Sequence, residues 1–294
     1  MKNDKLNFYL PEFFYKFNLN SKFVMLQKER PEVFRDGAVI SGVYGCFPTS
    51  IWNAGRCMSG YCSKENMENT SKFYNENGVS IRYTYTNQLI EEKHLYDTFC
   101  NLSMEVNNNG MNDVIVYSEL LEKYIRGNYP SYGIISSTTK RILNDKTLLE
   151  ELEKGYKLVV IDYNYNNSEL LFESPIVDHA GNIELLVNAY CRDNCSIRCD
   201  HYKALSEQQI TYAETSDFPM CNNIVEDFYT VMKTRKSFIK VEDLYGKYAD
   251  AGYRHFKIEG RTNNNFDVLE SYIYYMIKPE YQNEIRLQIL RGLQ

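Results

Sequence analysis

The stretch DVIVYSELLEKYIRGNYPSYGIISSTT, residues 113–139, holds one strand, one helix and a second strand in succession. The β-branched runs at 113–118 and 132–139 are typical of buried strands. Between them, SELLEKYIRG carries apolar residues at helical spacing, and Ser118 is placed to cap the helix. A strand followed by a helix and another strand is the repeating unit of α/β folds, so this stretch predicts that class.

The same unit recurs along the rest of the chain. Further helical patterns cover 92–110, which stops at Gly110, and 144–155, which stops at Gly155. Strand patterns occur at 6–10, 38–45, 79–86, 113–118, 132–139, 157–163, 183–190 and 255–260. Eight strands that alternate with helices within 294 residues predict a single (β/α)8 TIM-type barrel over residues 1–294.

Features near the two ends of the chain bear on this prediction. The segment FDVLESYIYYMIKPEYQNEIRLQIL, residues 266–290, predicts two C-terminal helices divided at Pro279. A doubly wound open sheet is the alternative fold. No glycine-rich phosphate loop follows the first strand, which weakens the nucleotide-binding form of that alternative.

Composition narrows the class of protein. The chain is 44% hydrophobic and 24% charged, which is enough to bury a large core. Its net charge of -6 argues against a protein that binds nucleic acid through its overall charge, although this value does not exclude a local basic groove. The amino-terminal segment lacks a signal-peptide pattern, and no apolar run approaches a membrane span, so we expect a cytoplasmic protein with no membrane partner.

Three cysteines lie close together in AYCRDNCSIRCDHY, residues 189–202, which begins where the seventh predicted strand ends. In a barrel, active sites lie at the carboxyl ends of the strands, so we expect Cys191, Cys195 and Cys199 at the mouth. Cys221 follows 22 residues later. Four thiolates can enclose an iron–sulfur cluster, and we predict a cluster-binding insertion over about residues 191–221.

Two other interpretations of these cysteines stay open. Structural zinc sites usually take two short-spaced pairs, which the C-x-x-x-C-x-x-x-C run fits poorly. Cysteine also packs as a small hydrophobic residue, so the thiols can be free and buried. A disulfide framework is disfavoured, because eight cysteines in a reducing cytoplasm more often indicate metal or redox chemistry.

The residues around this run point to a known family. The segment LLVNAYCRDNCSIRCDHY resembles the cluster segment of the collagenase-like peptidase family (peptidase family U thirty-two), in which a strand-ending Asn leads to two Cys, an Arg and a His. The matching positions here are Asn188, Cys191, Cys195, Arg198 and His201. DLYGKYADAGYRHFKIEGR, residues 243–261, is similar to a second family segment, and YGCFPTSIWNAGR, residues 44–56, to a loop after the second strand.

The resemblance implies a barrel that carries a four-iron four-sulfur cluster. Relatives use prephenate or a similar carboxylate as an oxygen donor to hydroxylate RNA bases or a quinone precursor without molecular oxygen. The expected function is therefore oxygen-independent hydroxylation of an RNA base or a small molecule. The resemblance does not decide whether a protein partner also takes part. The alternatives are a peptidase, as the family name implies, and a non-catalytic cluster protein.

The sequence departs from the family in two places. The His-Gly followed by two cysteines that marks better-known members is absent. Cys199 stands where the family has no ligand, so the fourth ligand is either Cys199 or one of Cys46, Cys57 and Cys62. The chain also lacks the G-x-S-x-G and H-E-x-x-H motifs of serine and zinc hydrolases.

Charged residues at predicted strand ends supply the catalytic candidates. Lys257, Glu259 and Arg261 alternate along the last strand, so their side chains should point to one side of it. Such a row either binds a ligand or forms an ion-pair network that braces the barrel, because buried charges must be paired. Asp162 is a candidate catalytic acid or orienting carboxylate, although a strand-end Asp also caps loops.

The remaining candidates flank the cysteines or follow the second strand. Arg198 and His201 are suited to an anionic substrate and to proton transfer, or to hydrogen bonds with cluster sulfurs. His201 joins the catalytic candidates, and Asn188 and Arg198 are assigned to substrate binding. Trp52, Asn53 and Arg56 form a polar, aromatic loop that is suited to covering a ligand or stacking on a base, while packing is the alternative for Trp52.

Overall fold

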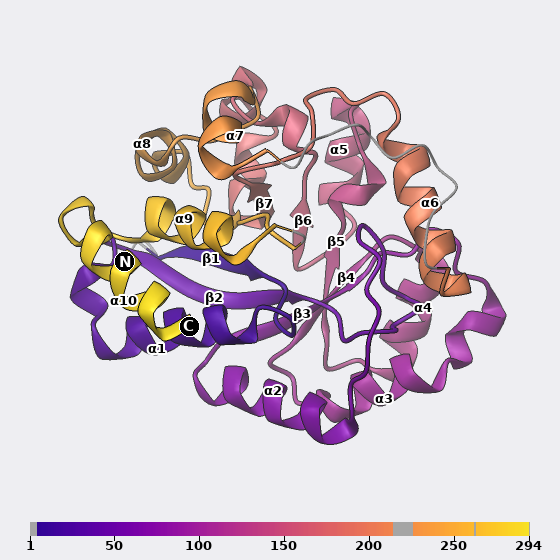
Figure 1. The fold of residues 1–294 in the computed structure, drawn as a ribbon. Coiled ribbons are helices and arrows are strands. Elements are labelled where there is room, and N and C mark those ends of the chain that lie inside the picture. Colours follow the sequence, from indigo (N-terminus) through magenta and orange to yellow (C-terminus); the bar gives the residue numbers. More distant parts are fainter. Residues whose placement is uncertain (1–4, 214–225, 262, 294) are drawn as a thin grey trace.

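The computed structural model describes residues 5–213, 226–261 and 263–293, which form a closed barrel of eight parallel strands surrounded by helices (Figure 1). Each strand pairs with its neighbour in the chain, and β8 pairs with β1 to close the barrel. The predicted (β/α)8 architecture is confirmed. The strands are β1 (Leu6–Pro11), β2 (Ala38–Gly45), β3 (Ser80–Tyr85), β4 (Asp113–Val116), β5 (Gly133–Ser136), β6 (Leu158–Val160), β7 (Ile183–Leu186) and β8 (His255–Lys257).

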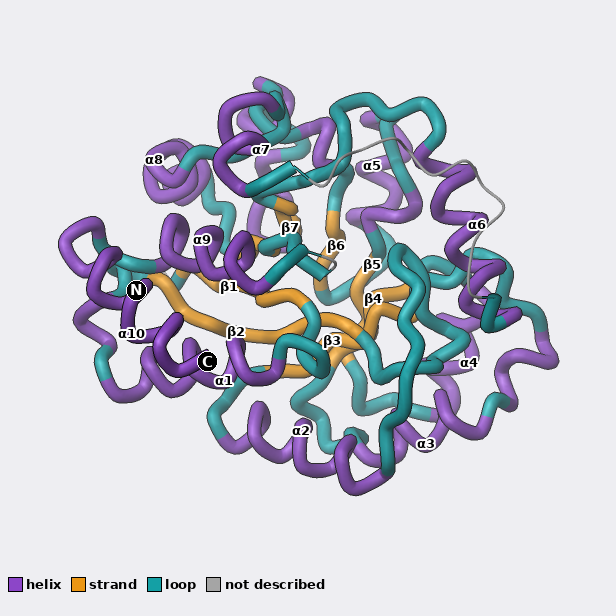
Figure 2. The backbone as a smooth tube through the Cα atoms, viewed as in Figure 1, coloured by secondary structure: helices purple, strands orange, loops and turns teal. Residues whose placement is uncertain are grey.

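Helices cover the outside of the strands, as Figure 2 shows for the purple helices around the orange strands. The two C-terminal helices are separated by a 3-10 turn at Pro279–Tyr281, as predicted. The helices are α1 (Phe17–Glu29), α2 (Lys64–Glu76), α3 (Thr98–Val106), α4 (Glu119–Asn128), α5 (Asp145–Leu152), α6 (Arg198–Thr211), α7 (Phe228–Thr234), α8 (Val241–Asp243), α9 (Asn265–Met276) and α10 (Gln282–Leu293). In the described part of the chain, no helix is long and apolar enough to cross a membrane.

The unit at 113–139 forms as its sequence predicts. The Ser118 hydroxyl accepts a hydrogen bond from the backbone N–H of Leu121 at 3.3 Å and caps α4. Leu121 and Ile125 are fully buried on the face of α4 that covers the strands. β4 and β5 run parallel, with Val114 opposite Ile134. Local capping and apolar periodicity therefore agree with the final fold.

Some elements end earlier than their patterns predict. The sixth strand stops at Val160, because Asp162 caps a following 3-10 turn. The helix expected over 92–110 divides at Asp97, whose carboxylate accepts a hydrogen bond from the Cys100 backbone N–H at 2.7 Å. Short polar side chains offer the backbone alternative hydrogen bonds, and at both places they set the boundary.

A buried ion network fills part of the barrel interior. The guanidinium of Arg82 lies 2.5 Å from a carboxylate oxygen of Glu184 and 3.4 Å from one of Asp113. All three side chains are at most 3% exposed. Lys157 reaches Asp113 at 2.7 Å from the half-exposed end of its side chain. The ring of Tyr9 packs against Arg82, with 3.3 Å between the guanidinium carbon and the ring centroid.

We expect the loss of Arg82 to destabilise the barrel strongly. The substitution Arg82→Met leaves the buried carboxylates of Glu184 and Asp113 without their shared cation, which should lower the free energy of unfolding by about 3–5 kcal/mol. The matched control, Lys157→Met, removes a half-exposed partner of Asp113 and should cost about 1 kcal/mol or less. Urea unfolding of both variants measures the difference, and equal losses would contradict a central role for Arg82.

Candidate active site

The carboxyl ends of the strands enclose a small pocket of about 80 Å³. Its lining comes from strands on several sides of the barrel, from the loop after β2 and from α6. Hydroxyl, amine and guanidinium groups share this lining with apolar side chains. The lining residues with polar groups include Tyr44, Arg56, Thr84, Tyr202, Lys257, Glu259 and Arg261. This is the end of the barrel at which the sequence predicts the active site.

Lys257 brings an amine from the last strand into the pocket. Its side chain is only 8% exposed. The amine nitrogen lies 4.0 Å from the centroid of the Tyr44 ring and 3.7 Å from the Glu184 carboxylate. Burial lowers the pKa of Lys257 to about 8, and Glu184 opposes that shift. A substantial fraction of this amine is therefore neutral near pH 8.

Glu259 is fixed at the rim of the pocket by both of its oxygens. One accepts a hydrogen bond from Arg56 at 2.8 Å, and the other accepts from the Tyr190 backbone N–H at 2.9 Å. Asn188 holds the backbone of Glu259 from the end of β7, accepting from its N–H at 2.7 Å and donating to its carbonyl at 3.1 Å. The Asn188 side chain thus continues the β7–β8 pairing and positions Glu259.

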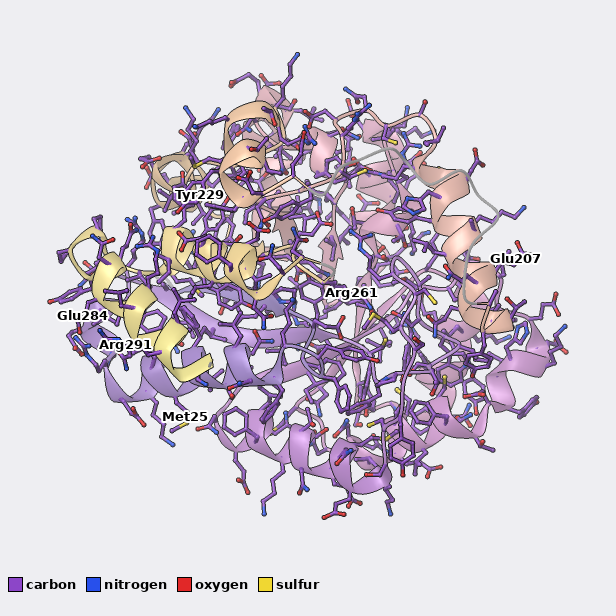
Figure 3. The ribbon with its side chains drawn as sticks, in the orientation of Figure 1. Met25, Glu207, Tyr229, Arg261, Glu284 and Arg291 are labelled. Atoms are coloured by element: carbon purple, nitrogen blue, oxygen red, sulfur yellow. The ribbon has the colours of Figure 1, made fainter. Side chains whose placement is uncertain are left out.

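Arg261 ties the end of the last strand to the segments that follow β1 and β2, and Figure 3 labels it near the centre of the molecule. It donates to the Glu12 carboxylate at 3.0 Å, to the Asn53 side chain at 3.0 Å and to the Ala54 carbonyl at 3.2 Å. Asn53 accepts a further hydrogen bond from the Thr84 hydroxyl at 2.9 Å. Arg261 lines the pocket, but its guanidinium already has several protein partners.

The alternating row of Lys257, Glu259 and Arg261 therefore faces the mouth as a set. Glu259 and Arg261 hold neighbouring segments together through short hydrogen bonds. Lys257 has a longer ion pair and an aromatic face beside its amine. Among these three residues, Lys257 has the polar group with the fewest close contacts to other protein groups.

Glu12 is a site residue that the sequence reasoning missed. It follows β1 directly, is fully buried and has a backbone φ of 58°, in the left-handed region that few non-glycine residues adopt. Burial raises the pKa of its carboxyl, and Arg261 opposes the shift. The sequence signal that could have identified Glu12 as a site residue is its position directly after the first strand. Thr84 and Tyr202 were also missed, because only the closed barrel brings β3 and α6 to one pocket.

Asp162 and Arg198 form a buried ion pair beside the pocket and do not line it. Asp162 also accepts hydrogen bonds from the backbone and side chain of Asn164, at 2.9 and 2.7 Å. The guanidinium of Arg198 stacks over the ring of Tyr163 at 4.3 Å. The pair joins the start of α6 to the end of β6. The structure places these two candidates where they anchor the cysteine segment.

Trp52 and His201 lie in different surroundings. Trp52 is fully buried against the edges of Tyr85 and Tyr124, and its indole N–H donates to the His94 carbonyl at 2.7 Å. The structure thus places its ring in the core and not on the pocket. His201 is half-buried on α6, and burial, followed by the charge of Arg56, lowers its pKa. His201 precedes Tyr202, which lines the pocket, but His201 itself does not line it.

The cysteine run follows β7 and reaches the mouth, but its thiols have different partners. Burial raises the pKa of the Cys191 thiol, and Tyr163 opposes the shift. Cys195 is half-buried, and the exposed Cys199 accepts a hydrogen bond from Arg141 at 3.3 Å. Cys221 lies outside the described residues. The three described thiols of the run therefore do not share one environment.

The other candidate ligands lie in the segment after β2. Burial raises the pKa of the Cys46, Cys57 and Cys62 thiols. Within residues 5–213, 226–261 and 263–293, no three His, Cys, Asp or Glu side chains are grouped so that they could hold a metal ion. The described donors thus do not fit a four-iron cluster by themselves, and no reaction step is assigned to one.

A larger cavity of about 450 Å³ lies outside the barrel, beside α7 and α8. Its lining includes the basic residues Lys233, Arg235, Lys236, Lys240 and Lys247. None of the residues that the sequence predicts for the site lines this cavity. The candidate chemistry is therefore concentrated at the smaller pocket in the mouth.

Comparison with known proteins gives one structural relative. No protein-family model matches the chain, and no curated protein matches it. The chain is similar to the solved structure of the U32 peptidase Mk0906, with a TM-score of 0.54 and 15% sequence identity. The similarity covers 87% of this chain and 93% of that chain. At this identity it supports the fold.

We expect Arg261→Met to destabilise the mouth in a pH-dependent way. It leaves the fully buried Glu12 carboxylate without its cation, at a cost of about 3–5 kcal/mol at neutral pH. The folded-state pKa of Glu12 is already raised above 4.5 and should rise further, so the penalty should be absent below 4.5 and grow as the pH increases through the raised pKa.

The control for this experiment is Arg56→Met, which removes a partly exposed partner of Glu259 and should cost about 1 kcal/mol or less. Thermal unfolding between pH 4 and pH 8 compares the two variants. A loss in Arg261→Met that does not change with pH would contradict the assignment of the penalty to Glu12.

Proposed function

We propose that the protein is an enzyme whose active site is the mouth pocket and whose substrate or co-substrate is a small molecule with a carboxylate. The observation that carries this proposal is the Lys257 amine, which lines the pocket at the end of β8 with only 6% of the residue exposed. Burying an amine inside a barrel is costly, and residues with strongly shifted pKa values in clefts are concentrated at functional sites.

The pocket combines positive charge with hydroxyl groups. Lys257, Arg56 and Arg261 contribute cations, and Glu259 contributes one carboxylate that is already paired with Arg56. The hydroxyl of Thr84 and those of residues 137–139 also line the pocket. This lining offers donors to the oxygens of a small anion, and Lys257 supplies a charge with a long ion pair as its protein partner.

The size of the pocket favours a small ligand over a peptide. A volume of about 80 Å³ encloses a compact group such as the oxo-acid end of pyruvate or prephenate, whereas a peptide substrate also needs an extended groove beside the pocket. Peptide processing is the alternative function, because the chain is similar in structure to a U32 peptidase. The pocket favours the small-molecule enzyme.

Oxygen-independent hydroxylation is the finer form of the proposal. It rests on the resemblance of residues 185–202 and 243–261 to the iron–sulfur branch of the collagenase-like peptidase family. A carboxylate such as prephenate would serve as oxygen donor, and an RNA base or a small molecule as acceptor. The position of Cys191 supports this form, because Cys191 directly follows Tyr190, whose backbone N–H donates to Glu259 at the rim of the pocket.

We predict that small carboxylates bind at Lys257. Isothermal titration of the wild type with pyruvate and with prephenate should give affinities that fall at least about tenfold in Lys257→Met, since about 1.4 kcal/mol of ion pairing is lost. Lys157→Met is the matched control, because Lys157 also pairs with the ion network but does not line the pocket. Unchanged affinity in Lys257→Met would remove the mouth pocket from the proposal.

The cluster is tested separately by metal analysis. If the hydroxylase form is correct, protein purified without oxygen should be brown and contain about four irons per chain. Cys191→Ala should lose the iron, whereas Cys100→Ala, whose thiol is fully buried on α3, should keep it. A folded, colourless sample with stoichiometric zinc would contradict the iron–sulfur form while leaving the carboxylate site untouched.

A further inference from the structure

We propose that the Lys257 amine is a nucleophile that forms an imine with the carbonyl carbon of a small 2-oxo acid bound in the mouth pocket. The inference rests on the proposed function, because it places the reaction in the same pocket. It goes beyond that function by assigning a covalent step and the chemical class of the ligand.

The partners of Lys257 leave its amine available. Glu184, the only carboxylate within ion-pair distance of Lys257 among the described residues, lies 3.7 Å away and is itself bound by Arg82 at 2.5 Å. Loss of the Lys257 proton therefore does not leave Glu184 unpaired. Arg261, two residues further along the strand, is held by Glu12 at 3.0 Å. In this set, the amine of Lys257 is the group that can give up its charge.

The surroundings of Lys257 also favour the neutral amine. Burial is the main cause that lowers its pKa to about 8, and the nearby cations Arg82 and Arg261 act in the same direction. The neutral form of a lysine is the nucleophile, and its usual pKa near 10.5 keeps that form scarce at neutral pH. The groups that face this amine from the neighbouring strands are Tyr9, Tyr44, Arg82, Glu184, Glu259 and Arg261.

The aromatic neighbours do not supply a competing charge. Burial raises the pKa of Tyr9 to about 12 and raises the pKa of Tyr44 as well, so both phenols are neutral where the amine titrates. The Tyr44 hydroxyl donates to the Ile258 carbonyl at 2.7 Å and presents its ring face to Lys257. The ring face of Tyr44 attracts the charged form of the amine, so Tyr44 and Glu184 act together against the effect of burial.

The proposed step is balanced without an oxidant or a reductant. The nitrogen lone pair of Lys257 attacks the carbonyl carbon, a carbon–nitrogen bond forms, and the carbonyl oxygen takes up a proton to become a hydroxyl. One of the two N–H protons of the amine offsets the proton taken up by the oxygen. A second proton, taken from solvent, lets the hydroxyl leave as water, and the remaining N–H proton returns to solvent to give the imine. The products are one imine and one water molecule. Before the imine forms, the charged fraction of Lys257 pairs with the carboxylate of the oxo acid; in the imine, the other donors that line the pocket, among them Arg56 and Thr84, take over that role.

Reductive trapping tests the inference on the full-length protein. Pyruvate and sodium borohydride should add one reduced adduct per chain, and peptide mapping should place it on Lys257. The adduct should be absent from Lys257→Arg, which keeps the positive charge but has no nucleophilic amine. It should persist in Lys157→Met, whose substitution lies in the same ion network but outside the pocket.

Two further measurements distinguish failure of the imine from failure of the proposed function: the pH dependence of trapping, and pyruvate binding without borohydride. The trapping rate should rise through about pH 8, the pKa of Lys257, and level off above it. Pyruvate should still bind Lys257→Arg when no borohydride is present. Binding to the wild type without any adduct would overturn the imine and leave the proposed function standing. An adduct only on exposed lysines would likewise overturn the imine, and absence of both binding and adduct would overturn both proposals.

Discussion

A single buried carboxylate, Glu184, organises the interior of the barrel. It lies on β7 and binds Arg82 from β3 closely and Lys257 from β8 more distantly. Charges inside a protein must be paired, and removing one member of such a set leaves the others uncompensated. Arg82 binds one oxygen of Glu184, and the amine of Lys257, which lines the pocket above, is the cation beside the other oxygen at 3.7 Å. The stability of the barrel and the reactivity of the mouth therefore depend on the same carboxylate.

A second set of contacts keeps the mouth in shape. Asn188 holds the backbone of Glu259, and Arg261 connects the last strand to Glu12 after β1 and to Asn53 after β2. These side chains replace strand pairing where the strands end, so the short β8 continues as an ordered segment. Precise placement of a reactive group requires such support, because small displacements are costly for chemistry. In this arrangement, most of the polar residues at the mouth position others, and few are left to meet a ligand.

Much of the fold could be predicted from the sequence, and part of the site. The strand runs were recognisable because each is short, apolar and bounded by turn residues, as in the stretch from 113 to 139. Two-residue alternation also placed the side chains of Lys257, Glu259 and Arg261 on one side of the last strand. The ion pair between Asp162 and Arg198 could not be predicted, since it depends on how two separate segments pack. The orientation of Trp52 was equally hidden, because a loop has no periodicity that indicates which way a side chain points.

The most direct test of the account is the titration of Lys257 itself. Carbon-13 NMR of protein labelled at the lysine ε carbons follows each amine through its pKa, and Lys257→Met identifies the relevant signal. The account predicts that this signal titrates with a midpoint near pH 8. A midpoint near the usual value of 10.5 would contradict it, because Lys257 would then be a fully charged member of the ion network at neutral pH.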